Sequence, residues 1–88
     1  MSYNLEFSKK FDKQIDKLDK SISTKILKYL INNLDGCQNP RNLGKALVGN
    51  KAGKWRYRVG NYRVITLIED EKLVVLALEV AHRKDIYK

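Results

Sequence analysis

The sequence predicts a small α+β domain, in which an N-terminal helical hairpin packs on one face of a small antiparallel β-sheet in the order β-α-α-β-β-β. Apolar residues recur with helical spacing between residues 7 and 34, and they alternate or run continuously between residues 54 and 81. Short turn signals separate the later segments. The 88 residues suffice for a single domain, residues 1–88, and they contain no linker, repeat or low-complexity segment.

The first strand and the two helices follow from periodicity and capping. Residues 2–7 alternate between polar and apolar, which is typical of a half-buried strand. Ser8 is suited to cap a helix that runs to about Asp19. A second helix follows a short turn near residues 20–23 and ends near residues 32–36, where Asn and Gly favour termination. Because the connecting turn is short, the helices should lie antiparallel.

Both helices carry an apolar stripe that needs a surface to cover. The first stripe is formed by Phe7, Phe11, Ile15 and Leu18, and the second by Ile22, Ile26, Leu27, Leu30, Ile31 and Leu34. Residues 37–53 are the least regular part, with the single proline, Pro40, and three of the five glycines. We predict a loop there with a helical turn, in which Leu43, Leu47 and Val48 tuck against the core.

Three strands are predicted after this loop, at residues 54–59, 62–69 and 73–81. Turn residues at 60–61 and 70–72 separate them, so they should form an antiparallel meander. The last strand is apolar enough to be central. The pattern leaves open whether the first strand adds to this sheet at an edge or in the middle.

The charge distribution points to a polyanionic partner. The net charge is +8 and the pI is about 9.7, which favours nucleic acid over an acidic protein or an anionic membrane. No apolar run approaches the ~20 residues that span a bilayer, and the N-terminus lacks a secretory signal. The single cysteine, Cys37, cannot form an internal disulfide, which fits a reducing cytoplasm. We therefore expect a cytoplasmic protein without a membrane partner.

Three arginines lie in the first two strands of the meander. Arg56 and Arg58 are two residues apart, so they leave the same face, and Arg63 follows the tight turn close to Arg58. Arginine matches phosphate with a planar fork of donors. The pattern leaves two alternatives open, namely that the arginines are an ordinary solvated face and that Arg63 pairs with Glu69 or Glu79.

The C-terminal residues HRKDIYK hold a second group of candidates. They form a short basic tail that adds either a helical turn or a strand end. His82 can exchange a proton near neutral pH, and Arg83 can stabilise negative charge on a phosphorus centre. A lone histidine is also often structural. Tyr87 completes the group, and Lys84 and Lys54 are expected to add RNA contacts.

The residues also exclude several classes of site. No Cys and His residues have metal-ligand spacing, no pair of carboxylates stands out, and no glycine-rich phosphate motif is present. We therefore expect no metal and no cofactor. A nuclease of this composition must act on RNA, because the 2′-hydroxyl of RNA can attack the adjacent phosphate when cations stabilise the developing charge.

Two motifs resemble a known family. The turn and strand GNYRV and the ending VAHRKDIYK look like the RelE branch of the RelE/ParE superfamily of type II toxins, and the resemblance covers essentially the whole chain. It implies a toxin that cleaves mRNA in the ribosomal A site, without metal, leaving a 2′,3′-cyclic phosphate. It also implies neutralisation by an acidic, RelB-like antitoxin. ParE-like inhibition of DNA gyrase and a catalytically silent homologue are the alternatives.

The resemblance also assigns roles to residues. Arg56 and Arg58 fall where RelE toxins have basic residues, often lysine, and Arg63 matches the arginine of the turn-strand motif. Arg83 and Tyr87 match the C-terminal arginine and tyrosine, which act in proton transfer and base stacking. Arg58 departs from the lysine that is the presumed base of some members, and arginine stays protonated. The expected catalytic residues are therefore Arg58, Arg63, His82, Arg83 and Tyr87, and the expected RNA-binding residues are Lys54, Arg56, Arg58, Arg63 and Lys84.

Overall fold

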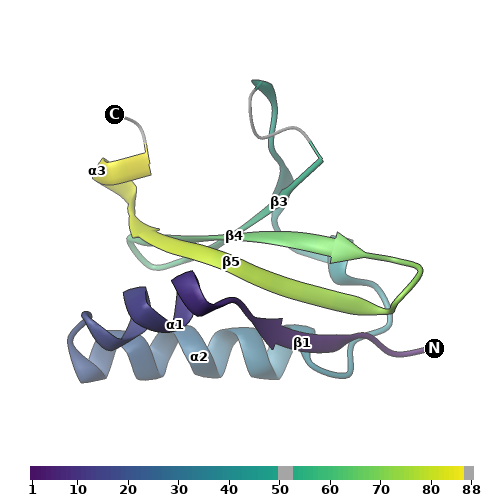
Figure 1. Cartoon of the computed structure of the whole chain (residues 1–88), viewed down its shortest axis with the longest axis horizontal. Helices are drawn as coiled ribbons and strands as arrows, with labels where there is room; N and C mark the ends of the chain where they lie inside the picture. The colour runs from purple at the N-terminus through teal and green to yellow at the C-terminus, as the bar shows by residue number, and fades with distance from the viewer. Residues whose placement is uncertain (50–52, 87–88) are drawn as a thin grey trace.

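The computed structural model describes residues 1–49 and 53–86, apart from the side chains of 85–86, and it confirms the α+β class and the element order. The chain runs through β1 (Asn4–Phe7), α1 (Lys9–Asp16), α2 (Lys20–Leu34), the 3₁₀ turn η1 (Pro40–Asn42), β2 (Lys45–Ala46), β3 (Trp55–Val59), β4 (Tyr62–Glu69), β5 (Val74–His82) and α3 (Arg83–Ile86). α1 and α2 cover one face of the sheet, and α3 lies on the opposite side (Figure 1).

The sheet has five strands in the order β1-β5-β4-β3-β2. The meander β3-β4-β5 is antiparallel, as predicted, and β5 is flanked on both sides. β1 takes the edge beside β5 and runs parallel to it, so the sheet is mixed rather than wholly antiparallel. At the other edge, the two residues of β2 pair with β3, which the sequence analysis did not predict.

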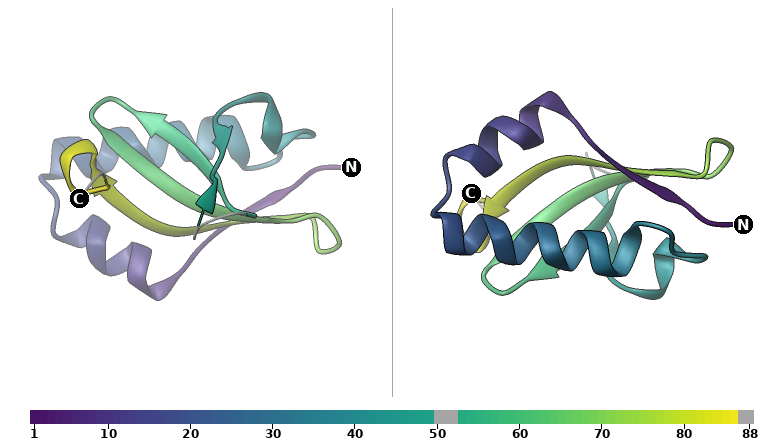
Figure 2. Two further views of the ribbon diagram at one scale, coloured as in Figure 1. Left: turned by 90° about the horizontal axis from the view of Figure 1, so that it is seen from above. Right: turned by 90° about the horizontal axis from the view of Figure 1, so that it is seen from below.

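The first helix of the hairpin begins where it was expected to begin, but it ends earlier than expected. The Ser8 hydroxyl accepts a hydrogen bond of 3.0 Å from the backbone N–H of Phe11 and donates one of 2.8 Å to the Leu78 carbonyl, so Ser8 both caps α1 and ties it to β5. α1 ends at Asp16 rather than near Asp19. Seen from the helical side in Figure 2, α1 and α2 lie beside each other across the strands.

The core lies between the two helices and the inner face of the sheet. Burying these apolar side chains is the main driving force for folding. The core is formed by Phe11, Ile15, Ile26, Leu30 and Leu34 from the helices and by Tyr57, Val59, Val64, Val75, Ala77 and Val80 from the strands. Of the loop residues expected to join it, Leu47 is half-buried, but Leu43 and Val48 are exposed, so that prediction was wrong for these two. Within the described residues, no helix combines the length and apolar character needed to cross a membrane.

Candidate anion-binding site

The register of β3 and β4 brings the three predicted arginines together. Arg58 is the direct partner of Arg63, and Arg56 lies two residues along β3. Tyr57 and Val59 alternate with the arginines and are buried under the helices. The arginines therefore leave the other face of the sheet, the side on which α3 lies in Figure 1.

The three arginines differ in exposure. Arg58 is exposed, Arg56 is half-buried, and Arg63 is only 7% exposed. A buried cation is stable only when charged or polar groups compensate its lost hydration, so Arg63 is the arginine most constrained by its surroundings.

Of the two carboxylates that the sequence offered to Arg63, only Glu79 lies near it. Glu69 is at the far end of β4, about 20 Å along the strand at ~3.3 Å per residue. Glu79 lies two residues along β5 from Ala81, which is the direct partner of Arg63. The same carboxylate is 3.5 Å from the Lys10 ammonium, so its charge is shared with α1. The alternative of an Arg63 ion pair therefore reduces to Glu79.

A pocket of about 260 Å³ gathers the cations of this face, and we call it the arginine pocket. It is lined by Tyr29, Gly44, Lys45, Arg56, Arg58 and Arg63. Four of these residues are cations and none is a carboxylate, so the pocket attracts an anion of the size of a phosphate group. Burial raises the pKa of the Tyr29 phenol, which keeps this residue a neutral hydroxyl donor at the rim.

Gly44 allows the loop before β2 to lie directly on β3. Its φ is +77°, in the left-handed region, and a Cβ built there would overlap the Arg56 carbonyl oxygen and lie 2.8 Å from the Trp55 indole nitrogen. A side chain at this position would therefore push the loop away from the strand. This close approach is what places Lys45 opposite Arg56.

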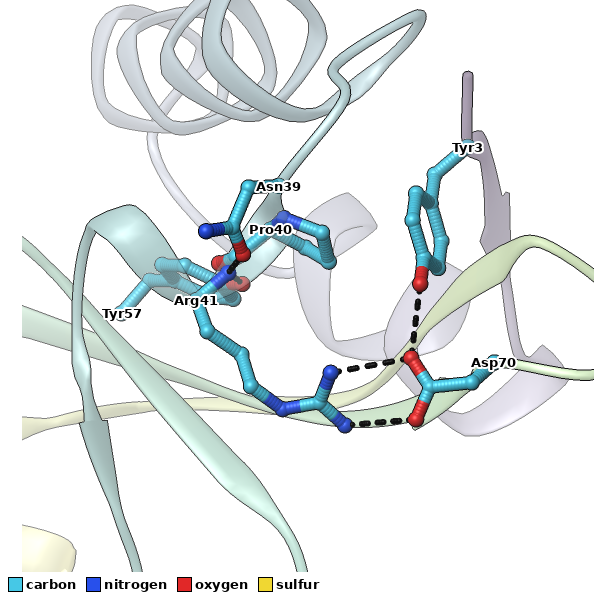
Figure 3. A network of polar contacts seen from close by, with 6 residues as sticks. All are labelled: Tyr3, Asn39, Pro40, Arg41, Tyr57 and Asp70. Carbon is cyan, nitrogen blue, oxygen red and sulfur yellow. Dashed lines mark hydrogen bonds and ion pairs between the residues drawn. The ribbon is translucent and has the colours of Figure 1, made fainter. Parts of the chain in front are cut away.

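A polar network fixes the same loop from its other end (Figure 3). The Arg41 guanidinium donates two hydrogen bonds of 2.9 Å to the Asp70 carboxylate, and the Tyr3 hydroxyl donates a third of 2.7 Å. These donors, Arg41 first, lower the pKa of Asp70 to about 2. The network thus joins η1, the start of the chain and the β4–β5 turn.

Two further hydrogen bonds hold the loop against β3. The buried Tyr57 hydroxyl donates to the Pro40 carbonyl, and the Trp55 indole donates to the Leu43 carbonyl at 2.6 Å. Burial also raises the pKa of Tyr57. The Arg41 guanidinium lies 6.0 Å from the centre of the Trp55 ring, so the network and the strand are in direct contact.

His82 lies on the opposite, helix-covered face of the sheet. Its partner across β4 and β5 is Tyr62, whose ring meets the imidazole edge-on at 5.2 Å between centroids. Both rings line a pocket with Gln14 of α1 and with Lys17 and Leu18, which follow that helix. Arg58, Arg63 and His82 were all expected among the catalytic residues, but the strand register places the His82 side chain on the face opposite to the two arginines.

The remaining predicted residues lie nearer the ends of the strands. Arg83 and Lys84 are exposed at the start of α3, and the Arg83 N–H donates a hydrogen bond of 2.7 Å to the Asn61 carbonyl in the β3–β4 turn. Lys54 is half-buried just before β3, and it lines a separate pocket with Trp55. Tyr87 lies outside the described residues. Among the residues that the structure describes, no group of three His, Cys, Asp or Glu side chains could hold a metal ion.

Three residues that line the arginine pocket, Tyr29, Gly44 and Lys45, were not among the predicted site residues, and neither was the network beside it. Lys45 reaches the pocket because the loop crosses β3, and Tyr29 reaches it because α2 passes the edge of the pocket. No pattern in the local sequence indicates either arrangement. The sequence PRN did mark Arg41 as a turn residue, but its partner Asp70 is 29 positions away.

Comparison with known proteins gives consistent matches. The family model described as the ParE toxin of the type II toxin–antitoxin system, parDE, matches residues 5–87. Toxin RelG of Mycobacterium tuberculosis is 32% identical over 88 residues, which cover 100% of this chain and 99% of that protein. These matches span the chain almost end to end, so they concern the whole domain.

Solved structures give the same result. The toxin–antitoxin complex RelBE2 from M. tuberculosis matches with a TM-score of 0.84 at 29% identity, covering 94% of this chain and 93% of that chain. The isolated E. coli RelE toxin matches with a TM-score of 0.71 at 22% identity, covering 98% and 92%, and at that identity it supports the fold alone.

Proposed function

The chain belongs to the ParE toxin family of type II toxin–antitoxin systems, within the RelE/ParE superfamily, and from this premise we propose that it is a ribosome-dependent, metal-independent mRNA endoribonuclease that inhibits translation. The observation that carries the proposal is the arginine pocket, with four cations and no carboxylate around a phosphate-sized cavity. Its substrate is mRNA in the ribosomal A site, so it acts in the cytoplasm.

The reaction that suits this pocket uses the nucleophile of the substrate. The 2′-hydroxyl of the RNA releases its proton to solvent as its oxygen attacks the adjacent phosphorus, the bond from phosphorus to the 5′-oxygen breaks, and that oxygen takes up a proton from solvent. The products carry a 2′,3′-cyclic phosphate and a 5′-hydroxyl. Negative charge builds up on the phosphoryl oxygens in the transition state. Preorganised donors that stabilise such charge each contribute roughly 100- to 1,000-fold to the rate.

Within this mechanism the arginines hold charge rather than move protons. A guanidinium is not deprotonated in proteins, so Arg58 and Arg63 bind and neutralise the scissile phosphate while Arg56 and Lys45 bind its neighbour. Arg83 approaches the scissile phosphate from the side of the sheet on which α3 lies. Lys54 and Lys84 add sequence-independent contacts to the RNA backbone, and Tyr87 stacks on a base.

The proposed protein partner is an acidic, RelB-like antitoxin encoded beside this chain. Similar structures include the RelBE2 complex of M. tuberculosis and the intact RelBE toxin–antitoxin complex of E. coli. A net charge of +8 favours an acidic, amphipathic segment by complementarity. We expect its binding to bury or displace part of the arginine pocket or the C-terminal tail.

Primer extension on mRNA from a cell-free translation reaction tests the endoribonuclease function. Wild type should cut within codons on the ribosome, in the presence of a chelator, and Arg63→Gln should reduce cleavage at least tenfold. Lys13→Gln is the control, because it removes the same charge from an exposed position of α1. No cleavage by wild type, or full cleavage by Arg63→Gln, would refute the proposal.

The name of the matching family favours one second candidate, which is ParE-like inhibition of DNA gyrase by binding. A supercoiling assay with the same proteins separates the two functions. Gyrase inhibition by wild type in the absence of mRNA cleavage would establish the second candidate. Cleavage without gyrase inhibition would exclude it.

A further inference from the structure

The imidazole of His82 is fixed at the junction between β5 and α3. Its Nδ1 accepts a hydrogen bond of 3.2 Å from the backbone N–H of Lys84. His82 immediately precedes α3, so it occupies the position from which a side chain caps the first turn of a helix. Only an imidazole with an unprotonated Nδ1 accepts this bond, so the neutral ring carries its proton on Nε2.

Contacts on both sides of the junction reinforce this position. Behind the sheet, the Tyr62 ring meets the His82 ring at an interplanar angle of 85°. At the start of α3, the Arg83 N–H is bound to the Asn61 carbonyl. The first turn of α3 is therefore attached to the β3–β4 turn and to the last residue of β5.

These contacts at the start of α3 determine where Arg83 lies relative to the arginine pocket. Arg63 lies between its two direct partners, Arg58 on β3 and Ala81 on β5. Arg83 comes two residues after Ala81, and α3 lies on the open side of the sheet in both figures that show it. A change in the direction of α3 would thus move the Arg83 guanidinium relative to Arg63.

We propose that His82 is a positioning residue, whose Nδ1 caps α3 and thereby holds Arg83 beside the arginine pocket, and that it does not transfer a proton in the reaction. The contribution of Arg83 to cleavage rests on the proposed endoribonuclease function, but the cap itself does not. Proton uptake on Nδ1 would turn the acceptor into a donor and break the bond to Lys84. The ring also lies behind the sheet, in a pocket with Gln14 of α1.

The test compares His82→Asn with His82→Ala. Asparagine supplies a side-chain oxygen that caps helices well but transfers no proton at neutral pH, whereas alanine supplies no acceptor. We expect His82→Asn to cleave mRNA within about threefold of wild type and His82→Ala to be at least about fivefold weaker, which is the factor that a lost cap typically represents. Hydrogen exchange of the α3 amides should accelerate in His82→Ala only, with the core amide of Val64 unchanged as a fold control.

Two measurements on the wild-type protein and its variants would overturn the proposal. Imidazole ¹⁵N shifts that place the proton of the neutral ring on Nδ1 would contradict the cap. Cleavage lost equally in both variants, with α3 amides exchanging as in wild type, would show that His82 acts chemically. If wild type itself cleaves no mRNA, the proposed function fails, and the ¹⁵N shifts and amide exchange still decide whether the cap exists.

Discussion

Arg58 and Arg63 stand directly opposite each other across β3 and β4, so two guanidinium groups leave the same face of the sheet side by side. Like charges in direct cross-strand positions destabilise a sheet. A bound anion that contacts both guanidinium groups would relieve this repulsion. The placement of these two residues is therefore the main structural argument that this face binds phosphate.

Replacing one member of this pair should separate stability from activity. Arg58→Gln should raise the free energy of unfolding by a few tenths to about 1 kcal/mol, because it removes a like-charge contact, while it lowers mRNA cleavage. Arg58→Lys keeps the charge and should leave stability unchanged. Urea denaturation of the three proteins measures the effect. A loss of stability in Arg58→Gln alone would show that the pair is stabilised by other groups of the chain.

Gly44→Ala should be strongly destabilising. Its left-handed φ alone costs about 1–2 kcal/mol for a residue with a Cβ, and the clash with the Arg56 carbonyl should add about 1–3 kcal/mol. Gly36→Ala is the matched control, since its φ is +81° but nothing lies within 4 Å of the added Cβ. Equal losses of stability in the two variants would mean that the loop does not lie tightly on β3.

The network around Asp70 predicts a difference in acid stability. The hydrogen bonds from Arg41 and Tyr3 lower the pKa of Asp70 from 3.8 to about 2. A lowered pKa in the folded state stabilises the protein above pH 4, and this contribution is lost as the pH falls from about 4 to about 2. Wild type should therefore be more stable than Asp70→Asn near pH 6, and the difference should shrink near pH 3. A difference independent of pH would contradict the ion pair.

Tyr57→Phe should destabilise the fold without creating a cavity in the core. The ring is fully buried and stays in place, but the Pro40 carbonyl loses its donor. A buried carbonyl left without a hydrogen bond costs about 1–3 kcal/mol. Thermal unfolding followed by circular dichroism measures the change. A variant as stable as wild type would show that water or another donor replaces the hydroxyl.

Local periodicity was sufficient to predict which face the residues of β3 take. Tyr57 and Val59 are buried and Arg56 and Arg58 are on the other face because side chains alternate along a regular strand. The rule fails in β5, where a register shift opposite Ile65 and Thr66 changes the buried positions from Val75 and Ala77 to Val80, so strict alternation would not have placed His82 on the helix-covered face. The face that His82 takes therefore depends on an irregularity of β5 that has no signal in the local sequence.

Strand partners and loop crossings could not be predicted in the same way. Alternation in residues 4–7 indicates a strand, but nothing in it selects β5 as a parallel neighbour. Lys45 joins the arginine pocket through a strand of two residues, which is too short to show a period. The bond between Arg41 and Asp70 depends on contacts that form only when the whole sheet is assembled.

One measurement tests the central claim most directly, that this face of the sheet promotes attack by the 2′-hydroxyl of mRNA on its own phosphate. It uses programmed ribosomes with two mRNAs that differ only by a single 2′-deoxy nucleotide at the mapped cleavage position. The unmodified mRNA should be cut to a product ending in a 2′,3′-cyclic phosphate, and the modified one should remain intact at that position. Equal cleavage of both mRNAs at that position would contradict the account.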